Sequence, residues 1–164
     1  METLFLLDRT EWRVVHVAGI AIFLGNVIVT AVWKALADRT GDARTIAFAQ
    51  RLVTLTDWVF TAGGVALILA SGYAMAALTG WLTPWGGFGP GWLQWGFGLF
   101  LASGVLWGAI LIPIQIVQAR MARRFQDGGP IPAVYWTLSR VWLWVGIVAI
   151  LLPALNLYLM VVKP

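Results

Sequence analysis

The fold of this chain is decided by residues 13–34, RVVHVAGIAIFLGNVIVTAVWK. A transmembrane helix needs roughly 20 mostly apolar residues to cross about 30 Å of hydrocarbon, and this segment is long enough. It carries the only histidine of the chain, His16, near one end and Lys34 at the other. The segment therefore predicts a membrane-spanning helix with an ionisable group near each end.

Three further apolar segments follow, so the sequence predicts four spans, at about residues 14–35, 52–78, 92–117 and 138–161. Hydrophobic residues make up 60% of the 164 residues and charged residues only 11%. A soluble domain usually has about 25% charged residues. We therefore expect residues 1–164 to form a single all-α membrane domain, a four-transmembrane-helix bundle in contact with the lipid bilayer.

The connections between the spans differ in composition. Residues 38–51 are charged, and Asp42 is expected to cap a helix there. Residues 79–91, TGWLTPWGGFGPG, contain five glycines and two prolines, which forbid a regular helix. A third connection is predicted at residues 118–136. Before the first span, residues 1–12 begin with the apolar residues 4–7 and are predicted to lie in the membrane interface as a short amphipathic lead-in. A cleaved signal peptide is the competing interpretation.

The basic residues predict an orientation. Three of them, Arg9, Arg13 and Lys163, lie near the chain ends. The other eight lie in or beside the first and third connections: Lys34, Arg39, Arg44, Arg51, Arg120, Arg123, Arg124 and Arg140. The positive-inside rule therefore predicts a multi-pass protein of the bacterial inner (plasma) membrane with both termini on the outer side. Because no basic patch is interleaved with aromatic residues outside the spans, we expect no nucleic-acid partner.

The composition also excludes several chemistries. Cysteine is absent, which excludes disulfides, thiol catalysis and thiolate metal sites. The sequence shows no Ser/His/Asp set, no paired carboxylates within a span and no phosphate-binding glycine motif. Whether the protein is an enzyme stays open at this point.

Small residues and prolines predict helix packing. Gly104 and Gly108 are four residues apart, a spacing that lets two helix backbones approach closely. We expect this pair to pack within the chain, with a homodimer contact as the alternative. Pro113 and Pro153 lie inside predicted spans, where the missing N–H predicts kinks.

Polar residues inside the spans are the first place to look for function, because burying them unpaired in lipid is costly. At about 100° per residue, His16, Asn26, Thr30 and Lys34 share one face of the first span. We expect this face to point into the bundle, with Lys34 forming an ion pair with Asp57 of the second span. That pair would either hold the first two helices together or handle protons.

A second polar level is predicted near the outer end. Imidazole binds haem iron and methionine can supply a second axial ligand, so His16 and Met75 are candidate haem ligands. Gln94 and Asn156 are further candidates for cofactor binding. His16 with methionine also suits copper. The alternative is a histidine that only hydrogen-bonds Asn156 or Gln94.

The single histidine limits any haem site, since one chain cannot ligate a haem through two of its own histidines. A haem would be held by His16 and Met75, by His16 with an open position, or across a dimer.

The sequence resembles a bacterial membrane family known as domain of unknown function 2269. The resemblance covers roughly residues 12–78 well and the rest by pattern. It is carried by His16, Gly25-Asn26, Thr30, Trp33-Lys34, Arg51, Asp57-Trp58-Val59-Phe60 and Gly63-Gly64.

More distantly, this family is similar to the HemJ-type protoporphyrinogen oxidases, which bind haem b, and to the CopD-type copper-resistance membrane proteins. The resemblance implies that His16 is a haem or metal ligand. Our first functional hypothesis is therefore a haem-b-associated redox protein. The alternatives are a non-enzymatic accessory subunit of a larger membrane complex, and copper or small-ligand handling at the outer mouth.

Overall fold

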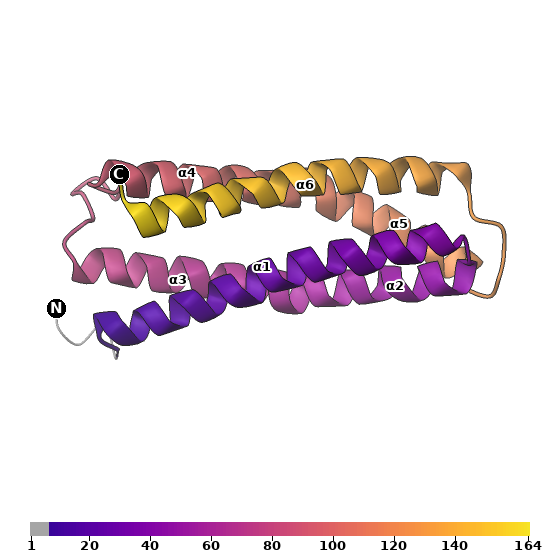
Figure 1. Cartoon of the computed structure of the whole chain (residues 1–164), viewed down its shortest axis with the longest axis horizontal. Helices are drawn as coiled ribbons and strands as arrows, with labels where there is room; N and C mark the ends of the chain where they lie inside the picture. The colour runs from indigo at the N-terminus through magenta and orange to yellow at the C-terminus, as the bar shows by residue number, and fades with distance from the viewer. Residues whose placement is uncertain (1–6) are drawn as a thin grey trace.

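The computed structural model describes residues 7–164, which form four long antiparallel helices (Figure 1). Of the predicted interfacial segment 1–12, residues 1–6 lie outside this range and residues 9–12 form the start of the first helix. The second and third long helices each contain a short π-helical segment. In chain order the elements are α1 (Arg9–Thr40), α2 (Ala43–Thr56), η2 (Asp57–Thr61), α3 (Ala62–Leu78), α4 (Gly91–Leu106), η3 (Trp107–Leu111), α5 (Ile112–Phe125) and α6 (Ala133–Val162).

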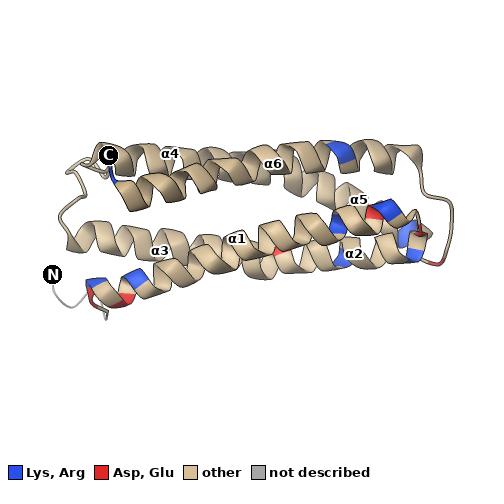
Figure 2. Ribbon diagram, viewed as in Figure 1, with Lys and Arg blue, Asp and Glu red and all other residues tan. Residues whose placement is uncertain are grey.

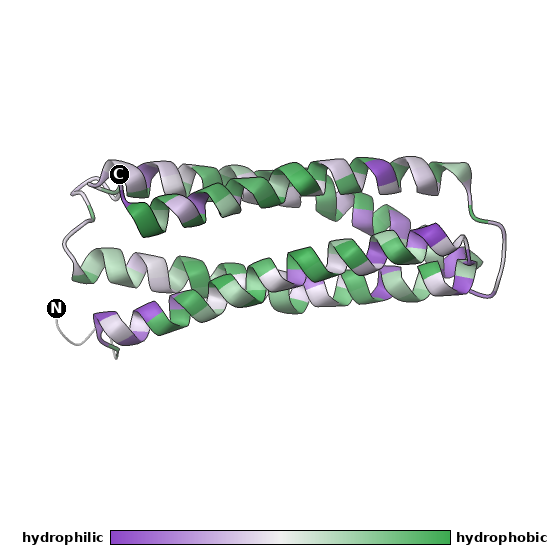
Figure 3. Ribbon diagram, in the orientation of Figure 1, coloured by the Kyte–Doolittle hydropathy of each residue, from purple (hydrophilic) through white to green (hydrophobic). Residues whose placement is uncertain are grey.

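The prediction of four spans is confirmed. The helices Arg9–Thr40, Ala43–Leu78, Gly91–Phe125 and Ala133–Val162 are each long and apolar enough to cross a membrane. Every predicted span lies inside one of them. Apolar residues predominate along all four helices (Figure 3), and many large apolar side chains on each of them are exposed. This is the arrangement expected of a bundle whose surroundings are lipid.

The first connection is shorter than predicted. Gly41, with φ of 65°, ends α1 in the left-handed conformation, which glycine adopts without a Cβ clash. Asp42 caps α2 as predicted and accepts a hydrogen bond from the Thr45 backbone N–H at 2.8 Å. The predicted connection 38–51 is therefore helical almost throughout.

The second and third connections also have defined ends. Residues 79–90 form an irregular loop, as predicted, with one isolated bridge between Leu82 and Phe88. In place of the predicted connection 118–136, helix α5 continues to Phe125 and α6 begins at Ala133.

Each π-helical segment contains one widened turn. In η2 the Ala62 N–H bonds the Asp57 carbonyl, and in η3 the Ile112 N–H bonds the Trp107 carbonyl. Pro113 is the second residue of α5, just beyond η3, where its missing N–H removes a helical hydrogen bond. Single π turns inside α-helices are frequent at functional sites.

The two ends of the bundle differ in charge (Figure 2). We call the end with the turn after α1 and the loop after α5 the basic end, because most Lys and Arg residues lie there. The opposite end, with the loop 79–90, the start of α1 and the end of α6, is called the aromatic end. The orientation of these ends across a membrane stays a prediction.

The two halves of the bundle also differ in packing. In the basic half, α1, α2, α5 and α6 form a closed ring in which each helix contacts the next. In the aromatic half, α1 packs on α3 and α4 packs on α6, and no Cα atom of α3 lies within 8 Å of α4 or α6. Across this divide the rings of Phe23 and Phe100 meet edge to face, with centroids 6.0 Å apart.

Glycines permit a close contact between α1 and α3, but they are not the predicted pair. A Cβ on Gly64 would lie 2.9 Å from Phe23 Cβ, and one on Gly19 would lie 2.9 Å from Leu67 Cβ. Gly104 and Gly108 are exposed and a Cβ there would meet nothing within 4 Å. The prediction that this pair packs within the chain is wrong, because α4 presents Gly96 and Ser103 to α6 and leaves its GxxxG face outward.

Candidate intramembrane polar site

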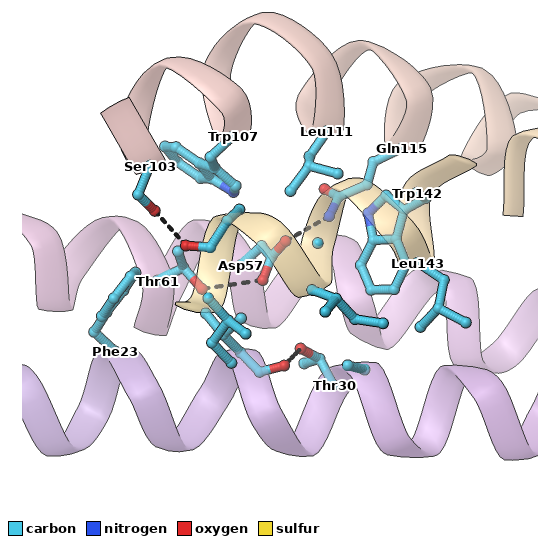
Figure 4. Close-up of a pocket in the computed structure, with 16 residues that line it drawn as sticks. Phe23, Thr30, Asp57, Thr61, Ser103, Trp107, Leu111, Gln115, Trp142 and Leu143 are labelled. Carbon is cyan, nitrogen blue, oxygen red and sulfur yellow. Dashed lines mark hydrogen bonds between the residues drawn. The ribbon is translucent and has the colours of Figure 1, made fainter. Parts of the chain in front are cut away.

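Asp57 is the centre of a buried polar site in the middle of the bundle (Figure 4). The residue is 6% exposed. Its Oδ1 accepts hydrogen bonds from Asn26 Nδ2 at 3.2 Å and Thr61 Oγ1 at 3.0 Å, and its Oδ2 accepts one from Gln115 Nε2. Three helices therefore supply donors to one carboxyl group.

The tight turn at Gly41 sets the register that brings these groups together. Because α2 starts immediately after the turn, Asn26 of α1 lies beside Asp57. Closer to the aromatic end, Gly19 of α1 lies beside Gly64 of α3. Within η2, Thr61 lies on the same side as Asp57, since the two side chains hydrogen-bond. The predicted inward face of the first span is confirmed: Thr30 and Lys34 are each 2% exposed.

A cavity of about 90 Å³ adjoins the Asp57 carboxyl. A cavity that holds water needs roughly 10–15 Å³ per molecule on this measure, so several water molecules fit. The indole N–H groups of Trp107 and Trp142 are buried without hydrogen-bond partners among the described residues. Both residues line the cavity, together with Thr61, Ser103 and Gln115, so the cavity offers free donors beside the carboxyl.

The predicted ion pair between Lys34 and Asp57 is wrong. The salt bridge of Lys34 is with Asp38, one turn further along α1, at 3.0 Å. Asn26 marks the level of Asp57 on α1, and Lys34 lies eight residues beyond it, about 12 Å along the helix. The prediction began the second span at about residue 52, and so placed Asp57 only about one turn from the end of that span.

Lys34 belongs to a separate network between α1 and α6. Its Nζ donates to Asp38 Oδ2, to Tyr135 Oη at 3.0 Å and to Ser139 Oγ at 3.2 Å. Tyr135 Oη in turn donates to Asp38 Oδ1 at 3.1 Å, and Ser139 Oγ hydrogen-bonds Asp38 Oδ2. Lys34 also lies 5.7 Å from the ring centroid of Trp142. Its charge is thus fully compensated, which is the arrangement of a structural ion pair.

His16 is held from α3. Its Nδ1 lies 3.1 Å from the Ile68 carbonyl and 2.9 Å from Ser71 Oγ. The carbonyl can only accept, and the Ser71 hydroxyl donates to the Leu67 carbonyl, so the proton of a neutral ring belongs on Nδ1. Nε2 is left with its lone pair, as in a histidine available for a metal.

The other residues predicted to join His16 are divided between helix pairs. Met75 lies on α3, one turn beyond Ser71. Gln94 is exposed on α4 and donates to the Phe88 carbonyl at 2.7 Å, and Asn156 of α6 packs against Gly96. Since α3 does not approach α4 or α6, the structure does not gather these four residues into one site.

Comparison with known proteins identifies the family. The model of the predicted integral membrane proteins called DUF2269 matches residues 11–164. The chain belongs to this family. The match covers both helix pairs, so the resemblance predicted mainly from the first half extends through the second. No curated protein and no solved structure matches the chain, and the distant similarity to HemJ-type and CopD-type proteins stays a prediction.

Sequence reasoning missed several residues of the polar sites in this DUF2269 protein. The missed residues are Gln115 and Trp107 beside Asp57, and Tyr135 beside Lys34. All three come from the second half of the chain, where the sequence predicted no partner for Asp57 or Lys34. One signal was present: Gln115 is an uncharged polar residue inside an otherwise apolar stretch directly after Pro113. Its partner could not be read from the sequence, because helix rotation across η3 depends on the π turn.

Proposed function

We propose that this membrane protein binds and releases a proton at Asp57 as part of a proton-coupled membrane activity. The observation that carries the proposal is a buried carboxyl group in mid-bundle that has hydrogen-bond donors but forms no ion pair with any residue that the structure describes. A carboxylate inside a membrane is costly unless it is neutralised. With Lys34 paired to Asp38, a proton is the simplest neutralising partner for Asp57.

The groups around Asp57 favour a proton over a metal cation. Cations such as Ca²⁺ and Mg²⁺ need several oxygen ligands, whereas Asn26 and Gln115 turn their amide nitrogens toward the carboxyl. The Thr61 hydroxyl can donate to a carboxylate or accept from a carboxylic acid. It can therefore partner both protonation states without rearrangement of the helices.

The cavity beside Asp57 supplies a route for the proton that leaves the carboxyl group. Water in a space of about 90 Å³ lined by Asp57 and the two indoles would hydrogen-bond the carboxyl and carry a proton away from it. Both π-helical segments line this cavity, through Asp57 and Thr61 on one side and Trp107 and Leu111 on the other. A small shift of either widened turn would change the hydrogen bonds of the carboxyl.

The test is an infrared titration of the protein reconstituted in lipid, comparing wild type with Asp57→Asn. The substitution keeps the size of the side chain and one acceptor oxygen, but it replaces the other oxygen with an N–H₂ donor and removes the proton site. We expect a carbonyl band of a protonated carboxylic acid that changes with pH in wild type and is absent in Asp57→Asn. Asp42→Asn, which removes an exposed carboxyl at the basic end, is the matched control and should keep the band.

Proton movement is measured separately in liposomes that contain a trapped pH dye. A potassium diffusion potential drives uptake, and Asp57→Asn is expected to reduce the protein-dependent rate at least tenfold while Asp42→Asn does not. If no carboxylic-acid band is lost in Asp57→Asn at any pH, Asp57 stays ionised and the proposal is wrong.

A second candidate is the haem or metal role of His16, which is favoured by its anchored Nδ1. Metal-ligating histidines commonly donate their other ring N–H to a carbonyl or a similar acceptor, and His16 does so at Ile68. The residues of the chain fit one axial position and do not define a second. Bound haem would supply one-electron chemistry, and His16 would hold and orient the iron.

The test of this candidate is the visible spectrum of the purified protein, oxidised and reduced, beside His16→Ala and Met75→Leu. A Soret band that shifts on reduction and disappears in His16→Ala supports haem b, and metal analysis of the same samples reports copper. A flat spectrum from cells supplied with haem would favour the accessory-subunit alternative, which co-purification of further membrane proteins would support.

A further inference from the structure

A groove of about 580 Å³ lies between α2 and α5 at the basic end, apart from the Asp57 cavity. This is within the range of ligand sites in proteins, about 300–1,000 Å³. Its polar part is lined by Gln50, Arg51, Arg123 and Gln126, and its apolar part runs along Leu55 to Trp58. We propose that it binds one anionic phospholipid, with the phosphate at Arg51 and Arg123 and an acyl chain along Leu55 and Trp58.

The charge of the groove fits an anion. Arg51 and Arg123 are exposed, one on each helix, and neither forms an ion pair among the described residues. None of the described residues that line the groove is Asp or Glu. Basic pockets between spanning helices are typical binding sites for anionic lipid headgroups.

Gln50 supplies an independent observation. It lines the groove but is only 1% exposed, and neither its amide nitrogen nor its amide oxygen has a hydrogen-bond partner within residues 7–164. A buried amide without partners is costly and needs a ligand or water. Its N–H₂ group can donate to a phosphate oxygen, and its carbonyl can accept from a headgroup hydroxyl.

The length of the groove favours a lipid over free phosphate. From Ala47 to Trp58, its furthest lining residues on the second long helix, the helix rises about 16 Å. That is about half of the 30 Å hydrocarbon thickness, the depth of one leaflet and far more than a phosphate ion needs. Leu55 and Trp58 are 58% and 61% exposed, so the inner part of the groove opens sideways, where acyl chains lie.

The first experiment is native mass spectrometry of the detergent-solubilised full chain, titrated with phosphatidylglycerol or with phosphatidylcholine of the same chains. We expect one tightly held phosphatidylglycerol, and about tenfold weaker binding in the double variant Arg51→Gln/Arg123→Gln. The matched control is Arg44→Gln/Arg124→Gln, which removes two arginines from the same end that do not line the groove. A general surface-charge effect would weaken both double variants equally and would overturn the proposal.

The second experiment uses the folded wild-type protein in nanodiscs containing phosphatidylglycerol with brominated acyl chains. Bromine quenches nearby tryptophan, and the difference between wild type and Trp58→Phe isolates the contribution of Trp58. We expect stronger quenching by brominated phosphatidylglycerol than by brominated phosphatidylcholine, and loss of this difference in Gln50→Leu. Equal quenching by both lipids, or displacement of the bound lipid by millimolar inorganic phosphate, would contradict a phospholipid site.

Discussion

The basic half and the aromatic half of this bundle contain the same four chain segments but are held together differently. In the basic half, buried polar side chains connect neighbouring helices: Lys34 joins α1 to α6, and Asp57 joins α1, η2 and α5. In the aromatic half, the helices pair through glycine contacts, as at Gly19 and Gly64. Where polar residues cross between pairs the ring closes, and where they are absent the pairs stay apart.

This difference follows from the membrane environment. In lipid, apolar side chains gain little by contacting each other rather than acyl chains, so helices associate through close backbone packing and interhelical hydrogen bonds. Both halves use interhelical hydrogen bonds, but in the aromatic half these bonds stay within one helix pair, as at His16 and Ser103. In the basic half they also cross between the two pairs. At the aromatic end, cations also lie over an aromatic ring: Arg9 is 5.8 Å and Lys163 is 5.9 Å from the ring centroid of Trp81.

The largest effect is expected from breaking the basic half at Lys34. Lys34→Met leaves Asp38 without its cation, and removing one partner of a buried ion pair typically costs 3–5 kcal/mol. We expect about 3 kcal/mol, because Asp38 keeps hydrogen bonds from Tyr135 and Ser139. The measurement is the free energy of unfolding in mixed micelles, followed by circular dichroism.

Two controls accompany Lys34→Met. Arg39→Gln, an exposed cation in the following turn, should change stability little, and Lys34→Met/Asp38→Asn should recover part of the loss. If Lys34→Met were as stable as Arg39→Gln, the ion pair would not hold the basic half together.

The second-largest effect is expected from Gly64→Ala, which disturbs the helix contact of the aromatic half. The new Cβ would lie 2.9 Å from Phe23 Cβ and 3.0 Å from the Gly19 carbonyl oxygen, and overpacking of this kind costs about 2 kcal/mol. Gly63→Ala is the matched control, since a Cβ there meets nothing within 4 Å. It should be neutral or stabilising by up to about 1 kcal/mol through helix propensity. The measurement is again the free energy of unfolding in mixed micelles. An equal loss of stability in Gly64→Ala and Gly63→Ala would contradict the glycine contact.

A smaller effect is expected from Ser103→Ala, which tests the other helix pair. Ser103 Oγ donates to the Ala149 carbonyl across α4 and α6 at 2.7 Å. Hydrogen bonds between membrane helices average about 0.6 kcal/mol, and we expect a loss of that size. Thr79→Ala removes a hydroxyl that bonds within its own helix and is expected to have a smaller effect in the same assay.

The smallest effect concerns the cap of α2 and depends on pH. Hydrogen bonds from the Thr45 hydroxyl and backbone lower the pKa of Asp42 below its ordinary value of 3.8. A lowered pKa in the folded state stabilises the protein above pH 4 and loses that contribution as the pH falls through the folded-state value. Asn is an equally good cap without a charge, so the stability difference between wild type and Asp42→Asn should shrink on acidification. A difference that is constant with pH would contradict this role.

The candidate site shows where sequence reasoning stops. Helical spacing correctly placed Asn26, Thr30 and Lys34 on the inward face of the first span, because a face is set by 3.6 residues per turn. The partner of Lys34 was predicted wrongly, because choosing between Asp38 and Asp57 requires the register between two helices. That register depends on a two-residue turn at Gly41, which the charged composition of residues 38–51 concealed.

The sequence by itself determined the membrane class, the four spans, the Asp42 cap and the irregular aromatic loop. These follow from length, hydropathy and local backbone chemistry, which act within one segment. Only the tertiary structure decided that Gln115 meets Asp57, that Tyr135 meets Lys34 and that Gly104 and Gly108 face outward. Those contacts depend on helix rotation and depth, which two π turns and one tight turn set and which no pattern within a single helix encodes.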